Sequence, residues 1–362
     1  MFSFADERNI SIPADEAHRL VAFVFTCRHT HLPSPLQNHA SPAARELRPG
    51  LGPAMAPAGR SMPGTLFKYG PDALHTAFLS GRGPTPAPSS SSPAPAAARH
   101  AVLVGGLTDG LFAVPWAERL AERLAPLGWD LVQPLLRSSY SGFGVRSLDE
   151  DAADLALLAA HLAAAWGSEG LVLVGHSTGS QDAVRYAKRL RELDVPVPLL
   201  GVVLQAPVSD REGEAGKPET QKMLELAGAM VEEGRGEEIL PLDACFNAPI
   251  CARRYCSLYA RGGDDDTFSS DVGDEQLREW VGHMEPYPTL VLLSGADEYV
   301  PRGYDTTGFA RRLEAAMGPR CRAAVIEGAD HALSAGEHAA AAVGEMEKFV
   351  ESLAAASRPA PG

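Results

Sequence analysis

The sequence predicts an α/β fold, in which a mostly parallel central sheet is flanked by helices. Strand-like and helix-like segments alternate from residue 65 to residue 355, which is the order expected of successive strand–helix units. The segment 171–174 (LVLV) contains no polar residue, so both of its faces must be covered, as in a parallel sheet. The length of 362 residues and the hydrophobic content of 45% allow one large domain or two small ones.

The predicted strands are short apolar runs. The first two are close enough in sequence to form a hairpin at the edge of the sheet. The later ones are separated by helical segments or long connections, as parallel strands require. In chain order the predicted strands are 65–69, 74–79, 101–104, 130–133, 171–174, 199–204, 289–293 and 322–326.

The clearest predicted helix follows Ser147. Glu150 lies three residues later and can reach back to the free backbone N–H, which forms a capping box. Leucines then recur at helical spacing as far as Trp166 and give the helix one buried stripe. The other predicted helices lie next to strands, at 114–125, 178–193, 306–316 and 336–355.

Charge and cysteine content narrow the class of protein. The chain has 32 Lys and Arg against 46 Asp and Glu, a net charge of -14, which disfavours nucleic acid and anionic membranes as partners. No apolar run approaches the roughly 20 residues that span a bilayer. Five cysteines without a C-x-x-C pair argue against a disulfide scaffold or a structural zinc site. We therefore expect a reducing compartment, the cytoplasm.

Two segments have biased composition. Residues 1–61 are rich in Ala, Pro and His without a sustained period, and lack the features of a secretory signal. We expect them to be disordered or poorly ordered, or to come from a wrongly assigned gene start, and we place the folded domain at 62–357. The Pro/Ser/Ala-rich stretch 81–99 cannot bury enough apolar surface to fold, so we expect a flexible loop inside the domain.

A candidate nucleophile lies where the apolar strand 171–174 turns into the next helix. The motif there is Gly-His-Ser-Thr-Gly, with Ser177 at its centre. A tight strand–turn–helix lifts a serine hydroxyl clear of the backbone, and the flanking glycines permit the close approach of strand and helix. In a chain with 35 glycines the motif alone is weak, so the strand before it and the helix after it carry the prediction.

An acid and a base are expected later in the chain, in the order Ser, acid, His. Asp297 follows the strand 289–293 and His331 follows the strand 322–326. Ligand-facing groups in parallel sheets collect at the carboxyl ends of strands, so Ser177, Asp297 and His331 can converge. Glu298 and Asp330 are rival acids, although Asp330 is the neighbour of His331 and would have to fold back on its ring.

The oxyanion hole should use the backbone N–H of Thr178, the residue after the nucleophile, and that of Leu107 in the loop after the third strand. Gly105 and Gly106 in that loop would let the backbone approach a substrate closely. A phosphate-binding role for these glycines is weaker, because their spacing matches neither G-x-G-x-x-G nor the GK[ST] loop. His176, inside the elbow, is a further candidate for substrate contact.

Three other features have open interpretations. Tyr140, after a strand end, could hold a substrate oxygen, or its loop could be tied down by local hydroxyl bonds. The stretch 209–287 is too long for a plain connection and should form a lid or cap. The three acids 264–266 lack properly spaced partners for a metal, so we expect a solvated acidic loop and no metal site.

Five runs also resemble a eukaryotic α/β-hydrolase family that was long catalogued as a domain of unknown function and that includes the fungal fusarinine C esterase. They are GTLFKY (64–69), VGGLTDGL (104–111), SSYSGFGVRSLDED (138–151), GHSTGSQD (175–182) and GGDDDTFSSD (262–271). The resemblance covers about residues 62–355. It implies an α/β-hydrolase fold and a triad of Ser177, Asp297 and His331 that acts on an ester without metal or cofactor. For the fungal member it implies a cyclic hydroxamate siderophore, opened inside the cell to release iron.

The leading hypothesis is therefore a cytoplasmic serine hydrolase that cleaves a carboxylic ester, with a small-molecule partner and no cofactor. A lipase or a thioesterase would use the same triad. A non-catalytic receptor with this fold is the alternative from another class, although a receptor does not need an ordered Ser, Asp and His. Neither the substrate nor the oligomeric state is indicated by the residues.

Overall fold

The computed structural model describes residues 61–81, 98–245 and 247–356. The chain divides into two units, residues 1–59 and 60–362, and every described residue belongs to the second. The predictions for residues 1–60 and for the stretch 82–97 of the expected loop lie outside the described residues.

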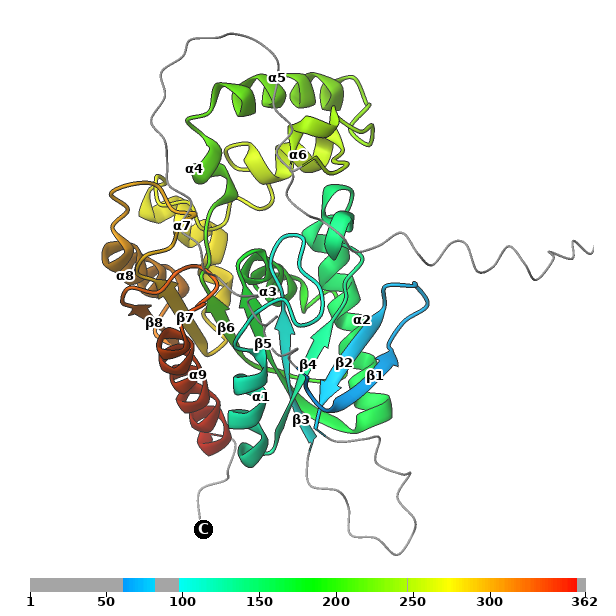
Figure 1. Cartoon of the computed structure of the whole chain (residues 1–362), viewed down its shortest axis with the longest axis vertical. Coiled ribbons are helices and arrows are strands. Elements are labelled where there is room, and N and C mark those ends of the chain that lie inside the picture. Colours follow the sequence, from blue (N-terminus) through cyan, green and yellow to red (C-terminus); the bar gives the residue numbers. More distant parts are fainter. Residues whose placement is uncertain (1–60, 82–97, 246, 357–362) are drawn as a thin grey trace, which may run out of the picture. The chain divides into compact units, whose positions relative to one another are not determined.

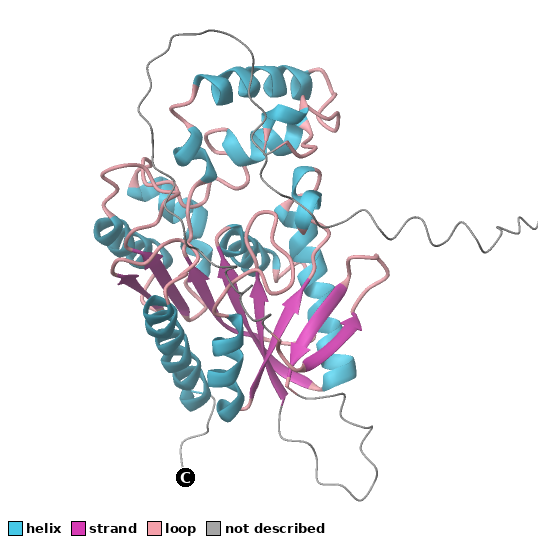
Figure 2. Cartoon of the chain, in the orientation of Figure 1, coloured by secondary structure: helices cyan, strands magenta, loops and turns pink. Residues whose placement is uncertain are grey.

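The centre of the described unit is one sheet of eight strands (Figure 2). Its order is β1-β2-β4-β3-β5-β6-β7-β8. The hairpin β1–β2 and the pair β2–β4 are antiparallel, and all other neighbours are parallel. The strands are β1 Gly64–Lys68, β2 Thr76–Ser80, β3 Ala98–Val104, β4 Trp129–Pro134, β5 Ser168–His176, β6 Leu199–Gln205, β7 Thr289–Ser294 and β8 Cys321–Ile326.

Helices cover both faces of this sheet and also lie beyond the carboxyl ends of its parallel strands (Figure 1). Apolar residues of α1 and α9 form the core on one face, and those of α2, α3, α7 and α8 form the core on the other. The α-helices are α1 Ala117–Leu124, α2 Leu148–Trp166, α3 Thr178–Arg189, α4 Asp210–Glu214, α5 Pro218–Glu232, α6 Ala252–Tyr259, α7 Asp274–Val281, α8 Thr306–Met317 and α9 Gly336–Ala356. Single turns of 3-10 helix lie at η1 Ala125–Leu127, η2 Tyr140–Gly144, η3 Leu242–Ala244 and η4 Gly282–Met284. The predicted α/β fold with a mostly parallel sheet is confirmed.

Helix α2 begins at the capping box that the sequence predicts. The Ser147 hydroxyl accepts the N–H of Glu150, and the Glu150 carboxylate accepts the N–H of Ser147, so both arms of the capping box form. Leu155, Leu158 and Leu162 then face the core and are almost fully buried. The helix therefore begins and faces the sheet as its sequence predicts.

Two of the boundaries that differ from those predicted have a clear structural reason. Ala98 and Arg99, assigned to the loop 81–99, belong to β3 and pair with β5, because a strand edge satisfies their backbone groups whatever their side chains are. Helix α3 ends at Arg189 and not at residue 193. Leu190 and Leu193 still pack against the core from a turn, which explains why the helical spacing of apolar residues continues past the helix.

The stretch 209–287 divides in two. Helices α5 and α6 form a separate apolar cluster with the segment between them, built on Met230, Leu240 and Leu258. Helix α7, in contrast, places Leu277 and Val281 in the main core beside α8. We call residues 210–259 the cap segment; in Figure 1 its helices lie beyond the carboxyl ends of the parallel strands.

The acidic run 264–266 is not the solvated loop that we expected. Asp264 is exposed, but Asp265 and Asp266 are almost fully buried. Asp265 Oδ1 accepts a hydrogen bond from Arg254 of α6 at 3.0 Å, and Asp266 Oδ2 accepts one from Arg211 of α4 at 2.9 Å. These ion pairs fix the loop to the cap segment, because either partner alone would be a buried, uncompensated charge.

A buried carboxyl pair makes stability depend on pH. Asp151 of α2 and Asp182 of α3 hydrogen-bond to each other, and burial, reinforced by the neighbouring carboxylates, raises the pKa of both side chains. Above the ordinary Asp pKa of about 4, this pair therefore holds more protons in the folded chain than in the unfolded chain, and its contribution to stability falls as pH rises through that range.

We expect Asp182→Asn to weaken this fall in stability, because its amide can donate to Asp151 as the shared proton does. The slope of unfolding free energy against pH should drop by up to about 1.4 kcal/mol per pH unit. Urea unfolding at pH 5 and pH 8 measures this change. The control is Glu225→Gln, because Glu225 is an exposed residue of α5. An unchanged slope in Asp182→Asn would show that the pair is ionised throughout.

Candidate active site

Ser177 lies in a strained turn between β5 and α3. Its backbone has φ 53° and ψ -126°, a conformation that costs free energy in a non-glycine residue. The flanking glycines are required by space: a Cβ on Gly175 would lie 2.2 Å from the Gly179 oxygen, and one on Gly179 would lie 2.3 Å from the Val104 oxygen. The local geometry is thus that of an elbow that presents the serine side chain.

His331 and Asp297 are joined by a hydrogen bond. His331 Nδ1 lies 2.8 Å from Asp297 Oδ2, and Asp297 Oδ1 accepts the Tyr299 N–H at 3.0 Å. Because a carboxylate only accepts, Nδ1 carries the proton and Nε2 keeps a free lone pair. Both side chains are buried, which limits competition from water.

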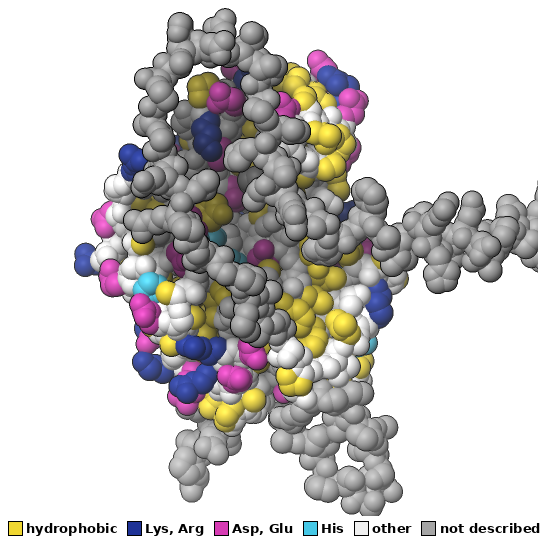
Figure 3. Space-filling view, viewed as in Figure 1, with side chains coloured by type: hydrophobic (Ala, Val, Ile, Leu, Met, Phe, Trp, Pro, Cys, Tyr) yellow, Lys and Arg dark blue, Asp and Glu magenta, His cyan; other side chains and the backbone are white. Residues whose placement is uncertain are grey.

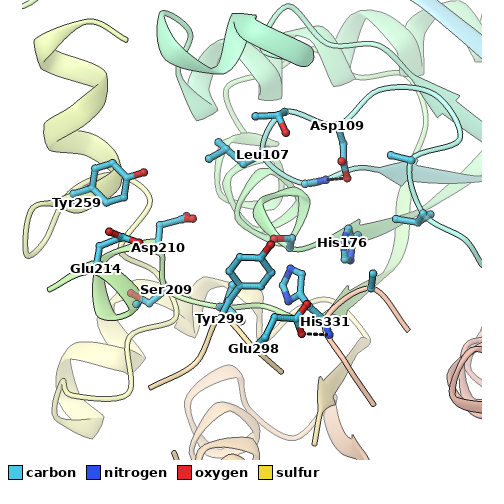
Figure 4. A pocket seen from close by; sticks show the side chains of 18 residues that line it. Leu107, Asp109, His176, Ser209, Asp210, Glu214, Tyr259, Glu298, Tyr299 and His331 are labelled. Atoms are coloured by element: carbon cyan, nitrogen blue, oxygen red, sulfur yellow. Dashed lines mark hydrogen bonds between the residues drawn. The ribbon is translucent and has the colours of Figure 1, made fainter. Parts of the chain in front are cut away.

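The two rival acids bind elsewhere. Glu298 Oε2 accepts the backbone N–H of His331 at 2.9 Å, as the dashed line in Figure 4 shows. Asp330 Oδ1 accepts the Ser334 N–H at 2.7 Å. Of the three acids considered from the sequence, Asp297 is therefore the one bonded to the His331 ring.

Ser177 and His331 line the same cavity, of about 570 Å³. Gly106, Leu107 and His176 line it too, whereas Asp297 is buried behind His331. Its far side, seen in Figure 4, is made by Ser209 and by Asp210, Glu214 and Tyr259 of the cap segment. The cavity thus extends from the strand ends to the cap segment and suits a small organic ligand.

The glycine loop after β3 approaches Ser177 closely. A Cβ on Gly106 would lie 2.8 Å from the Ser177 Cβ. Asp109 holds the loop in shape: its Oδ2 accepts the Gly106 N–H at 2.8 Å, and its own N–H donates to the Gly106 oxygen at 3.0 Å. Within the described chain, the N–H groups of Leu107 and Thr178 donate no hydrogen bond, so both are available to a ligand.

Gly105 and Thr178 lie beside this cavity and line a second, smaller one of about 30 Å³. A Cβ on Gly105 would lie 2.7 Å from that of Asp109. The close approach predicted for Gly105 is therefore to the loop itself, and Gly106 is the glycine that faces the larger cavity.

His176 is a neutral imidazole. Burial, reinforced by the nearby His331 ring, lowers its pKa to about 4. Its Nδ1 lies 2.6 Å from Gln205 Oε1, and Gln205 Nε2 donates to the His331 oxygen at 3.2 Å. The His176 and His331 ring centroids are 5.0 Å apart, so Gln205 and His176 help to hold the segment of His331 in place.

Tyr140 does not line the larger cavity among the described residues. Its ring covers Gly110, where a Cβ would lie 2.3 Å from the phenol oxygen, and its N–H donates to the Asp109 oxygen at 3.3 Å. The side chain is 49% exposed on the outside of the loop. The structure therefore favours the interpretation of Tyr140 as part of a tied-down loop.

Comparison with known proteins identifies the family. Residues 86–354 match the model of a family described as "Protein of unknown function (DUF1749)". The chain belongs to this family. Fusarinine C esterase sidJ from Aspergillus fumigatus is 32% identical over 295 residues, which cover 65% of this chain and 83% of that protein.

Two further relatives extend the match. Esterase AN6793 from Emericella nidulans is 27% identical over 358 residues, covering 82% of this chain and 92% of that protein. The structure of siderophore hydrolase EstB from Aspergillus fumigatus matches with a TM-score of 0.66 at 28% identity, covering 81% of this chain and 98% of that one. With the fold, these relatives identify the chain as an ester hydrolase of the α/β-hydrolase class, and the family resemblance of the motifs is confirmed.

Three residues at the site were missed by sequence reasoning. Asp109, three residues after Gly106, had a usable signal, because aspartate often accepts a nearby backbone N–H in a loop. Tyr299 places its ring 4.6 Å from that of His331, and Asp210 lines the cavity from the cap segment. The sequence alone does not place Asp210 or Tyr299 at the site, because their positions depend on how the cap segment and the loop of Asp297 fold.

The described residues lack both a metal-binding cluster and a membrane-spanning helix. They contain no cluster of three or more His, Cys, Asp or Glu that could hold a metal ion. None of the described helices is both long and apolar enough to cross a bilayer.

Proposed function

We propose that the chain hydrolyses its ester with Ser177 as nucleophile, His331 as general base and Asp297 as orienting acid. Ser177 attacks the carbonyl carbon while Nε2 of His331 takes the hydroxyl proton, which His331 then gives to the leaving alcohol. Water repeats the sequence on the acyl-enzyme and releases the acid. Asp297 keeps the proton on Nδ1 and stabilises the imidazolium that forms.

The oxyanion of the tetrahedral intermediate would be stabilised by the N–H groups of Leu107 and Thr178. Thr178 is the first residue of α3, where backbone N–H groups have no partner within the helix. The bonds between Asp109 and Gly106 fix the loop that carries Leu107, so this donor is oriented before the substrate binds.

The observation that carries the proposal is the position of Ser177 and His331 on one cavity, with the His331 ring bonded to Asp297. Hydrolysis of p-nitrophenyl acetate by the purified chain, with Ser177→Ala as the blank, tests it directly.

For the natural substrate we propose a fusarinine-type hydroxamate ester of a siderophore. The support comes from the relatives, which are named fusarinine C esterase and siderophore hydrolase. A bulky ester would need the room that the cavity of about 570 Å³ provides between the elbow and the cap segment. Iron would arrive as cargo of the substrate.

A lipase is the second candidate, and one observation favours it. Four aliphatic side chains of the cap segment are more than 40% exposed: Leu226, Val231, Ile239 and Leu242. Charged residues surround them, however, including Glu233, Arg235 and Glu238 in an exposed ion-pair network. Figure 3 shows the apolar and charged side chains next to each other over α5 and α6.

We expect fusarinine-type esters to be hydrolysed with a higher kcat/KM than long-chain triacylglycerols. A charged cap segment suits dissolved substrates better than an oil–water interface, where an apolar surface is needed. The measurement is kcat/KM for both ester classes, below and above the concentration at which the triacylglycerol forms an emulsion. Preference for triacylglycerol, or a jump in rate when the emulsion forms, would support the lipase.

Two further parts of the proposal concern the cap and the compartment. We propose that the cap segment acts as a lid over the cavity, since it supplies Asp210, Glu214 and Tyr259 to the wall. We also propose a cytoplasmic location. The described cysteines Cys245, Cys251, Cys256 and Cys321 are free thiols, which suits a reducing compartment.

A further inference from the structure

The described wall of the cavity is lined by acidic side chains and by no Lys or Arg side chain. Four of its residues are acids, namely Asp109, Asp210, Glu214 and Glu298, and none of its described residues is Lys or Arg. A ligand with a carboxylate or phosphate would be repelled by these acids. A ligand with a positive charge would be attracted.

Three of the four acids accept hydrogen bonds from other residues. Asp109 binds the Gly106 N–H, Glu298 binds the His331 N–H, and Glu214 binds the Lys217 ammonium at 2.6 Å. The Asp210 carboxyl, among the described residues, has only its own backbone N–H as a donor. Asp210 is therefore the acid of the described wall whose carboxyl holds no other residue, so a ligand can bind it without displacing an existing bond.

Asp210 lies on the opposite side of the cavity from the reacting groups. It is the first residue of α4, and Figure 4 shows it with Glu214 and Tyr259 on the cap side of the cavity, across from His331. An ester bound at Ser177 would thus extend one end toward Asp210. Asp210 is partly buried there, and a charge-assisted hydrogen bond is stronger in such a place than in water.

We propose that Asp210 determines specificity by binding an ammonium group on the ester substrate, at a distance from the carbonyl that Ser177 attacks. The inference rests on the proposed function, because the ester must react at Ser177 in the same cavity that Asp210 lines. It adds a substrate class: esters whose acyl or alcohol part ends in a primary amine.

The protonation state of the Asp210 carboxyl decides the pH at which the proposal is tested. Burial raises its pKa to about 7; Asp265 adds to this rise, while Arg254 and the His331 ring oppose it. Above that pH the group is ionised and can bind a cation. Assays at pH 8 therefore use the binding form.

The test compares p-nitrophenyl 6-aminohexanoate with p-nitrophenyl heptanoate, which differ by an ammonium in place of a methyl group. The quantity measured is the ratio of their kcat/KM values, so that defects in folding or in the acyl-transfer step cancel. We expect the ratio to fall about tenfold in Asp210→Asn, as for the loss of one partly buried charge-assisted bond. Glu225→Gln removes one negative charge at an exposed position of α5 and should leave the ratio within about twofold of wild type.

Equal ratios in wild type and Asp210→Asn would overturn the proposal, and so would the same fall in Glu225→Gln, which would indicate a general charge effect. Failure of the proposed function has a different signature. In that case neither ester is hydrolysed faster by the wild type than by Ser177→Ala, whatever residue stands at position 210.

Discussion

Replacement of Ser177 by alanine is expected to reduce kcat for a simple activated ester by about 10⁴-fold or more. The substitution removes only the hydroxyl at the elbow, so the nucleophile is lost while the cavity, the loop of Leu107 and the bond between His331 and Asp297 remain. The residual rate should come from binding and the oxyanion donors alone. Measurement of p-nitrophenyl acetate hydrolysis across a range of enzyme concentrations checks this.

Stability serves as the control for this variant. Alanine must adopt the same strained backbone, with φ near 53°, and it loses no packing of a large side chain. We therefore expect the melting temperature to stay within about 2 °C of wild type. If a well-folded Ser177→Ala kept more than a small percentage of the activity, another residue would be the nucleophile.

Asp297→Asn is expected to lower kcat by about 10⁴-fold with little change in shape. The Asn oxygen can still accept the Tyr299 N–H, as Asp297 Oδ1 does now. The amide NH₂ would then face Nδ1 of His331, and the proton of the ring would move to Nε2. In that tautomer Nε2 cannot accept the Ser177 proton. Steady-state kinetics should show the loss in kcat and a smaller change in KM.

Glu298→Gln is the matched variant, since Glu298 is adjacent in sequence and also bonds to His331. It does so through the backbone N–H, and a glutamine oxygen can accept the same bond. We expect its kcat to stay within about tenfold of wild type. Wild-type activity in Asp297→Asn together with collapse in Glu298→Gln would assign the acid to position 298.

Local sequence signals predicted most of the fold. The capping box at Ser147 and the apolar segment 171–174 of β5 were informative, because a helix start and a strand covered on both faces depend on nearby residues. The elbow at Ser177 was predictable for the same reason: its glycines are needed where strand, turn and helix meet. His331 and Asp297 followed from their place after strands, since parallel strands end at one edge.

The features that the sequence did not reveal depend on distant partners. The sequence predicted that Asp265 and Asp266 are solvated. In the structure Arg254 of α6 pairs with Asp265 and Arg211 of α4 pairs with Asp266, which makes the burial of both carboxylates possible. The sequence left two interpretations of Tyr140 open, and the position of its ring against Gly110 favours the tied-down loop. Asp210 joins the site only because the cap segment folds over the strand ends, and no local pattern specifies where a cap will lie.

Covalent labelling by a fluorophosphonate probe tests the central claim, an activated serine at position 177, most directly. The probe reacts with a serine only when a base and oxyanion donors assist the attack. We predict one adduct per wild-type chain, located on Ser177 by peptide mass spectrometry, absent in Ser177→Ala and formed far more slowly in Asp297→Asn. Absence of an adduct in the folded wild type, or an adduct on a different residue, would contradict the account.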